Sequence, residues 1–220
     1  MSLPTGITAG DLLFVFFGRD QSDTMTHPSG WWRHFDLLNG GARAIVYTRV
    51  ADGSEGSTIT ATSTGADQSG HWSCRISNYS DSGDHFQMNT TSTEVSNGAA
   101  DPPSLTPSGG AADYLWITGY HASGNDCDAD VYPTNYSYLQ FTQKYADGTL
   151  DEGGMAVAAR QLNATTDNPS AFSMVTGNQR TPVTFTATIS YLNQDAVLPW
   201  ESAGEQVTGG WISRYRWATV

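Results

Sequence analysis

Basic residues are scarce in this chain, where 10 Lys and Arg stand against 22 Asp and Glu and give a formal net charge of −12. Nucleic-acid-binding proteins gather Lys and Arg on one face to contact phosphates, and so few bases do not supply such a face. An anionic membrane surface would repel the same charge. The composition therefore argues against a nucleic-acid partner and against a membrane partner.

Long apolar segments and cysteines are also few. The longest apolar run, Leu12–Phe17, is six residues long, whereas a membrane-spanning helix needs about 20. The first eleven residues contain no Lys or Arg, which a secretion signal carries before its apolar core. Two cysteines, Cys74 and Cys127, are too few for a disulfide framework. We therefore expect a soluble protein made in a reducing cytoplasm, with one disulfide bond at most.

Helical periodicity is missing as well, while strand patterns are dense. Ala42–Val50 is rich in β-branched residues, and His71–Tyr79 alternates so that Trp72, Cys74 and Ile76 share one face. Short segments of this kind between Gly, Pro, Asn and Asp clusters are typical of an all-β sandwich or jelly roll. The expected strands are Asp11–Gly18, Ala42–Val50, Ser57–Ser63, His71–Tyr79, Asp113–Tyr120, Ser137–Thr142, Gly154–Leu162, Ala171–Thr176 and Val183–Tyr191. The expected core residues are Leu13, Val15, Phe17, Ile45, Tyr47, Trp72, Cys74, Ile76, Leu115, Ile117, Val157 and Ile189.

The two halves of the chain resemble each other weakly. Similar segments in the same order are Asp11–Val15 and Asp113–Ile117, Pro28 and Pro133, Ala44–Val46 and Ala156–Ala158, and Ser73–Ser77 and Thr186–Ser190. Two interpretations are open: two tandem small β domains, or one sandwich in which each half supplies strands to both sheets. We favour a single antiparallel, jelly-roll-like β-sandwich over residues 1–194, with halves at roughly 9–95 and 104–191.

The last residues, 195–220, break the alternation and hold three of the seven tryptophans. In an extended chain Trp211, Tyr215 and Trp217 share one side, and Ile212, Arg214 and Arg216 share the other. Trp, Tyr and Arg are the residue types enriched among interface anchors. We predict an extended C-terminal aromatic arm that binds a partner chain. The alternative is that the arm covers an edge strand of its own sandwich. The predicted partner-binding residues are Trp200, Trp211, Ile212, Arg214, Tyr215, Arg216 and Trp217.

Three motifs allow a comparison with a known family: Gly10-Asp11-Leu12-Leu13, Pro28-Ser29-Gly30-Trp31 and Ala51-Asp52-Gly53-Ser54-Glu55. Together with the strand pattern over residues 9–191, they resemble a β-sandwich module of bacteriophage virion structural proteins. The resemblance implies a protein of the virion surface, assembled in the host cytoplasm and forming a homo-oligomer on the particle. The favoured role is a capsid decoration (cement) protein that binds the major capsid protein or other virion proteins. The alternative is a tail or fibre adhesin that binds host glycans.

Sequence signatures of catalysis are absent, because the chain has no Gly-x-Ser-x-Gly elbow, no His-Glu-x-x-His and no phosphate loop. We therefore expect no enzymatic activity and no cofactor. The five histidines, His27, His34, His71, His85 and His121, are expected in turns or at the surface. Asp126, Asp128 and Asp130 alternate as Ca²⁺ ligands can, but the EF-hand Gly and Glu do not follow, which favours a solvated turn.

Aromatic residues next to turns are the candidates for glycan contact. Trp31 and Trp32 follow a Pro-x-Gly turn, and Tyr132 belongs to a second aromatic group near a loop. Such rings can stack on sugars, or they can close the end of the sandwich. Cys74 is expected to be a buried small apolar residue. Cys127 lies among acidic residues, which disfavour a reactive thiolate.

Overall fold

The computed structural model consists of β-strands joined by turns and loops. It describes residues 1–20, 22–65, 68–77, 86–92, 99–124, 127–146, 151–174, 182–190, 200–203 and 214–215. The strands are β1 Leu12–Asp20, β2 Met25–Thr26, β3 Trp32–Asn39, β4 Ala42–Val50, β5 Thr62–Ser63, β6 Ser69–Ile76, β7 Phe86–Ser92, β8 Ala99–Ala100, β9 Ala112–Ser123, β10 Ala129–Val131, β11 Tyr138–Ala146, β12 Asp151–Ala164, β13 Phe172–Met174, β14 Val183–Ser190, β15 Trp200–Ala203 and β16 Arg214–Tyr215.

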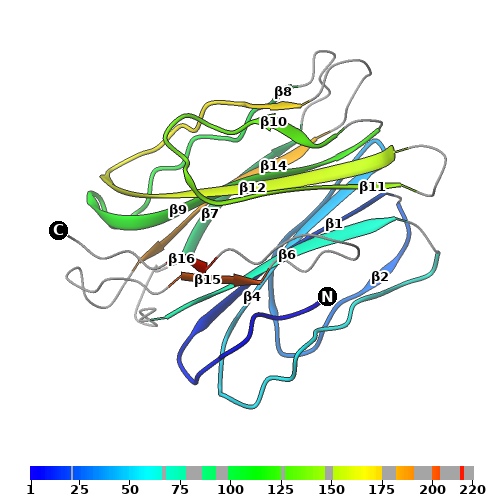
Figure 1. Cartoon of the computed structure of the whole chain (residues 1–220), viewed down its shortest axis with the longest axis horizontal. Coiled ribbons are helices and arrows are strands. Elements are labelled where there is room, and N and C mark those ends of the chain that lie inside the picture. The colour runs from blue at the N-terminus through cyan, green and yellow to red at the C-terminus, as the bar shows by residue number, and fades with distance from the viewer. Residues whose placement is uncertain are drawn as a thin grey trace.

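Two antiparallel sheets face each other and form one sandwich, as expected (Figure 1). One sheet has the order β16-β15-β6-β1-β4-β3, and the other has the order β11-β12-β9-β14-β7. Their inner faces share a single apolar core, in which the rings of Phe16 and Phe185 meet edge to face at 4.9 Å. Because this core is built from both halves, the halves are not two tandem domains.

The two halves build the same unit twice. The order β3-β4-β1-β6 in one sheet repeats as β11-β12-β9-β14 in the other, and β2 pairs with β5 as β10 pairs with β13. The repeat extends to the register, because Leu12 lies opposite Ile76 as Leu115 lies opposite Ile189. The expected sharing of strands is therefore wrong. Each half forms the body of one sheet, and in the described chain only β7 crosses from the first half to the second sheet.

The sequence alignment of the two central strands is also off by one residue. The sequence comparison aligned Leu12 of the first half with Tyr114 of the second half. In the structure, Leu12 faces the shared core and Tyr114 faces outward. The inward equivalent of Leu12 is Leu115. Both faces of β1 and of the middle of β9 are buried, and both carry apolar residues. The alternation of polar and apolar residues that normally shows which side chains face the core is therefore missing from these strands.

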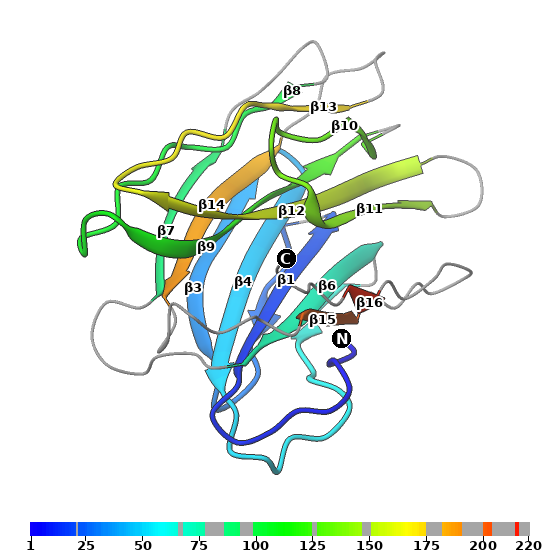
Figure 2. The same cartoon turned by 60° about the vertical axis from the view of Figure 1, so that its left-hand side comes forward.

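Each sheet is backed by a further layer on its outer side. The outward residues of β1 pack against the N-terminal segment and the β2–β5 pair, and those of β9 pack against the small sheet β10-β13-β8. These layers follow one another from top to bottom in Figure 1, and Figure 2 shows the same stacking from another side. Because both faces of the central strands are covered, every residue of the expected core is buried.

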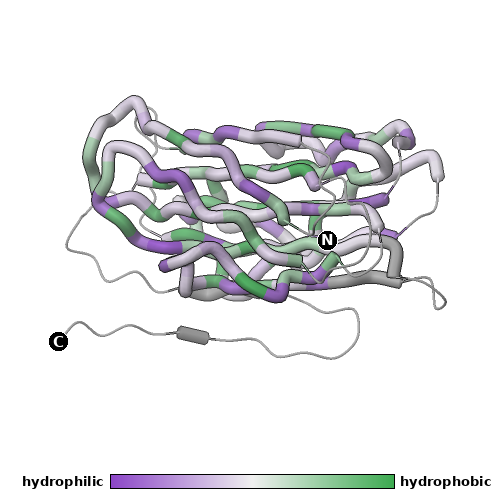
Figure 3. Tube along the Cα trace, turned by 90° about the horizontal axis from the view of Figure 1, so that it is seen from above, coloured by the Kyte–Doolittle hydropathy of each residue, from purple (hydrophilic) through white to green (hydrophobic). Residues whose placement is uncertain are grey.

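Edge strands were harder to predict than central ones. The strands β3 and β7 were missed, and the expected strand Ser57–Ser63 is reduced to β5. Hydrophilic and hydrophobic residues alternate over short stretches in the described part of the chain (Figure 3). In the C-terminal arm, β15 pairs with β6 and β16 pairs with β15 (Figure 2). The described part of the arm thus extends the first sheet. This agrees with the alternative prediction that the arm covers an edge strand of its own sandwich.

Candidate functional site

Trp32 is the most exposed large apolar side chain among the described residues, with 72% of its surface accessible. It begins β3, the edge strand of the first sheet. The ring of His34 lies 6.5 Å from the Trp32 ring, and the ring of Phe86 lies 4.1 Å from that of His34. This row of three rings at the rim of the sandwich ends in an indole that faces solvent.

A β-bulge places Trp32 there. Trp32 lies opposite Thr48 and Arg33 opposite Tyr47, but the next paired residue is Phe35, so His34 is the extra residue. A bulge changes the direction of a strand and re-aims its side chains. His34 Nε2 lies 2.7 Å from Thr48 Oγ1, and burial lowers the pKa of His34 from 6.5 to about 4. The neutral imidazole is therefore the form that supports the indole at neutral pH.

The other two glycan candidates are half-buried and pack against apolar clusters. Trp31 lies against the apolar cluster behind the first sheet. Tyr132 lies against the cluster behind the second sheet, with its ring 6.0 Å from that of Phe172. Burial and the charge of Asp128 raise the pKa of Tyr132 to about 12. The structure therefore does not bring the three aromatic candidates together, and Trp32 is the one of the three whose ring is exposed.

A polar cluster on the outer face of the first sheet combines His27, Asp36, Tyr47, Arg33 and Arg43. Arg43 donates from Nε to Asp36 Oδ1 at 2.6 Å and from a terminal nitrogen to Oδ2 at 2.8 Å. The His27 Nδ1 atom lies 2.7 Å from the Tyr47 hydroxyl. Arg33 donates to His27 Nε2, so the ring proton resides on Nδ1 and points to Tyr47. Burial, and then the charge of Arg33, lower the pKa of His27.

This Tyr–His–Asp arrangement looks like a catalytic relay, but its geometry is that of a structural network. The Tyr47 side chain is fully buried, and burial raises the pKa of its hydroxyl. A substrate cannot reach an enclosed hydroxyl, and a raised pKa opposes the phenolate that would attack. The sequence did not indicate the cluster, because its members come from separate strands and meet only through the β2, β3 and β4 packing.

The second half contains another polar network, at a different position in the repeat, because Arg160 corresponds to Arg49 in the register of the two halves. Asp167 accepts a hydrogen bond from Tyr136 and a bidentate pair from Arg160, whose Nε lies 3.0 Å from Oδ2. The guanidinium also stacks on the Tyr136 ring at 4.8 Å. Tyr136 is buried, and burial followed by the Asp167 hydrogen bond raises its pKa. These charged hydrogen bonds tie Tyr136, at the end of the turn before β11, to Arg160 of β12 through Asp167.

His121 contradicts the expectation that the histidines lie in turns or at the surface. It is fully buried on β9, where its Nε2 lies 3.7 Å from Asp20 Oδ1 of the opposite sheet. A Cβ added to Gly18 would lie 2.3 Å from His121 Cδ2, so the glycine provides the space for the ring. Burial lowers the pKa of His121 to about 3. The pair therefore joins the sheets as a neutral imidazole beside a carboxyl group.

Both cysteines are free and buried. This confirms the expectation for Cys74, whose thiol pKa is raised by burial. Cys127 was expected in a solvated turn, but it is enclosed behind the second sheet, and its Sγ donates to the Gly124 carbonyl at 2.8 Å. Among the described residues no three His, Cys, Asp or Glu side chains are grouped to hold a metal ion. Asp126 lies outside those residues, so the calcium interpretation stays untested.

The chain was compared with protein-family models, with curated proteins and with solved structures. None of the three comparisons found a match. In the part of the chain that the structure describes, no helix has the length and apolar character needed to cross a membrane.

The predicted partner-binding arm is described only in part. The backbones of Trp200, Arg214 and Tyr215 lie in β15 and β16. Trp211, Ile212, Arg216 and Trp217 lie outside the described residues. The pairing of β15 with β6 gives the arm a defined origin at the edge of the first sheet, and its proposed partner contacts stay a prediction.

Proposed function

We propose that this protein is a non-enzymatic structural component of a bacteriophage virion, and that it acts as a decoration or cement protein on the capsid surface. In this role it binds the major capsid protein and holds neighbouring subunits together, as one of many identical copies. One observation supports the non-enzymatic role above others. The groups best suited to chemistry, Tyr47, Tyr136 and His121, are enclosed and hydrogen bonded or paired within the fold.

The motifs that carry the resemblance to phage proteins have structural roles, which supports a shared architecture. Asp11 accepts from the Thr8 N–H at 2.9 Å and pairs with Arg75 at 3.1 Å. The turns of the other two motifs pass through Gly30 and Gly53 with φ of 78° and 85°, which favours glycine. The Pro28–Trp31 turn recurs in the second half as Pro133–Tyr136, with Asn135 at φ 67°. A rigid, doubly backed sandwich of this kind suits a particle surface.

The copy number per particle tests this proposal. Purified particles that contain the protein are separated on a denaturing gel, and its band is compared with that of the major capsid protein. A decoration protein is expected in hundreds of copies, close to a simple ratio with the shell subunit. A handful of copies per particle, or none, would reject the decoration role.

The exposed indole of Trp32 favours a second candidate function, a tail or fibre adhesin that stacks on host glycans. In that role, Trp32→Ala is expected to abolish binding to a glycan array, because aromatic faces supply much of the contact area of such sites. The matched control is Trp31→Phe, which changes a half-buried ring that packs against the cluster behind the first sheet. Equal binding by both variants would exclude the indole as a glycan platform.

A further inference from the structure

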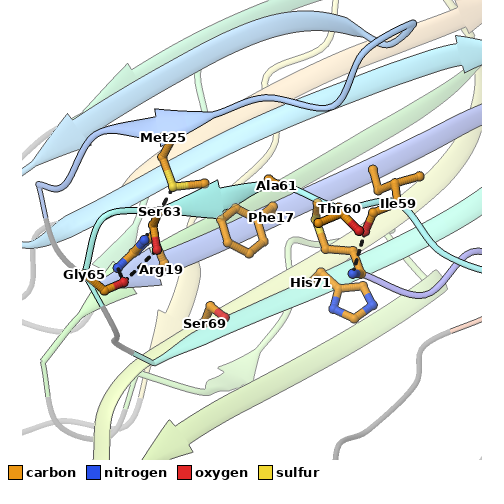
Figure 4. A pocket seen from close by; sticks show the side chains of 11 residues that line it. Phe17, Arg19, Met25, Ile59, Thr60, Ala61, Ser63, Gly65, Ser69 and His71 are labelled. Atoms are coloured by element: carbon orange, nitrogen blue, oxygen red, sulfur yellow. Dashed lines mark hydrogen bonds between the residues drawn. The ribbon is translucent and has the colours of Figure 1, made fainter.

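An open groove of about 480 Å³ lies behind the first sheet, between β5 and β6 (Figure 4). Its lining combines apolar and polar side chains: Phe17, Met25, Ile59 and Ala61, and Arg19, Thr60, Ser63, Ser69 and His71. Figure 4 shows these side chains around the space that separates the two strands. Neither of the two polar networks uses the groove, and its role is independent of the proposed virion function.

The internal repeat shows what covers the equivalent place in the second half. There β8 lies beside β13, with Ala100 opposite Phe172 and Ala99 opposite Ser173. Ala100 is fully buried in the cluster that contains Tyr120, Phe172 and Met174. On its other side, Thr184 of β14 donates to the carbonyl of Asp101, next to β8, at 3.1 Å. A strand thus fills the space between β13 and β14.

The residues that line the groove are the repeat equivalents of those that bury β8. Met25 lies opposite Ser63 as Ala129 lies opposite Met174, so Ser63 and Ala61 correspond to Met174 and Phe172. Because Leu12 corresponds to Leu115, Phe17 corresponds to Tyr120 by the same register, and His71 corresponds to Thr184. The groove is therefore the first half's version of the β8 site.

A backbone ladder leads into this site from one end. In the second half, Leu105 exchanges two hydrogen bonds with Asp167, and the same two segments continue to the Ala100–Phe172 pair. In the first half, Leu3 donates to Ser57 at 2.8 Å, and Met1 and Ile59 exchange bonds of 2.9 Å. The groove begins beyond that last pair, beside residues 60–63. Among the described strands, β5 pairs with β2 alone.

We propose that this groove accepts an extended segment of a different polypeptide chain, which adds to β5 as a strand in the place that β8 takes beside β13. Strand addition of this kind draws affinity from main-chain hydrogen bonds and specificity from the alternate side chains. The described strands of a second copy are already paired within its own sheets, so none of them can serve as the donor. We therefore assign the incoming strand to another protein.

The lining also defines the chemistry of the incoming strand. Ala61 and Ser63 stand where the second half has Phe172 and Met174. Because these side chains are smaller, the groove has more space than a residue of the size of Ala100 can fill. Apolar side chains that line unfilled space lose packing contacts. The segment that binds must therefore carry a bulky apolar side chain over Phe17, with small or polar residues on either side of it.

A short extension in front of Met1 tests the site in the full-length protein. The extension Ala-Thr-Phe-Thr continues the Met1–Ile59 ladder and places its Phe on the same side as Met1 and Leu3, which face the apolar cluster. The matched control, Ala-Phe-Thr-Thr, has the same composition and turns the Phe to the opposite face. The first extension is expected to raise Tm by about 4 °C or more, and the control to leave Tm unchanged.

Two further measurements make the result decisive. Ala61→Arg is expected to cancel the gain of the first extension, while in the protein without an extension it changes Tm less, because Ala61 lines the open groove. Equal Tm values for both extensions would overturn the proposal. Size-exclusion chromatography checks the donor: if the protein without an extension self-associates and only the inward extension separates the copies, the donor is a second copy, which would overturn the assignment to another protein.

Discussion

At the scale of single residues, the fold depends on a few positions where space and charge are matched closely. Gly18 leaves room for the buried ring of His121, and the bulged His34 supports the exposed indole of Trp32. Asp36 and Asp167 each hold two nitrogens of one arginine. The Gly18–His121 and Asp36–Arg43 contacts are not visible as a spacing in the sequence, because the partners lie on different strands.

Adding one methyl group at Gly18 tests the contact between the sheets. Gly18→Ala is expected to lower the free energy of unfolding by about 1–3 kcal/mol, because the new Cβ overlaps a ring that cannot leave the core. Gly56→Ala is the control, since no atom lies within 4 Å of its added Cβ. Urea unfolding of both variants gives the comparison, and equal midpoints would contradict the described position of His121.

The buried imidazole also predicts a dependence of stability on pH. Burial lowers the pKa of His121 to about 3 in the folded protein, against the ordinary value of 6.5 for a solvated histidine. Above pH 6.5 both states are neutral and the group has no effect. Between pH 6.5 and 3 the unfolded chain binds a proton that the folded chain refuses, so stability falls as the pH falls, by up to about 1.4 kcal/mol per pH unit.

His121→Gln removes this titration. The variant is expected to lose less stability than the parent between pH 6.5 and 4, while part of the decline remains because burial also lowers the pKa of His34. Thermal unfolding at a series of pH values measures the two slopes. Identical slopes would show that His121 is solvated.

At the scale of strands, the sequence was informative where strands are central and weak where they lie at edges. Ala42–Val50 was predicted with its observed bounds because β-branched residues fill both faces. The edge strand β7 was missed because its sequence, FQMNTTS, is mostly polar. In β3 the bulge at His34 breaks the alternation. The groove between β5 and β6 had no sequence signal, since it exists only by comparison of the two folded halves.

Removal of the C-terminal arm tests whether the arm is needed for folding or for binding to a partner. A chain cut after Asn193 lacks β15 and β16 but keeps both inner faces of the sandwich, so it is expected to fold. Because β6 then becomes an edge strand, we expect more self-association. Under the proposed virion role we also expect loss of particle binding. Circular dichroism and co-sedimentation with particles measure these properties. A truncated chain that fails to fold would place the arm in the core, and one that still decorates particles fully would move the binding surface elsewhere.

At the scale of the whole molecule, the two halves depend on each other although each repeats the other's design. The shared core takes Phe14, Phe16 and Trp72 from one half and Leu115, Val157 and Phe185 from the other. Neither sheet can bury its inner face alone. The fold class could be read from strand patterns, but the assignment of one half to each sheet could not, because strand pairing partners leave no local signal.

Separate expression of the halves checks this dependence. Residues 1–95 and 104–191 are each expected to lack cooperative unfolding, because the apolar inner face of each would stand in water. Co-expression is expected to restore a folded complex. Cooperative melting of either half alone would show that its backing layer suffices and would revive the interpretation as tandem domains.

The position of β1 in its sheet has a consequence for synthesis on the ribosome. Its neighbours are β4 and β6, so the most apolar segment of the chain leaves the ribosome long before either partner exists. At translation rates of about 5–20 residues per second, β1 waits for seconds with both faces uncovered. Non-local pairing of this kind slows folding, and an exposed apolar strand invites association between nascent chains. We therefore expect the yield of soluble protein to rise when ribosome-associated chaperones are abundant, or when low expression keeps nascent chains far apart.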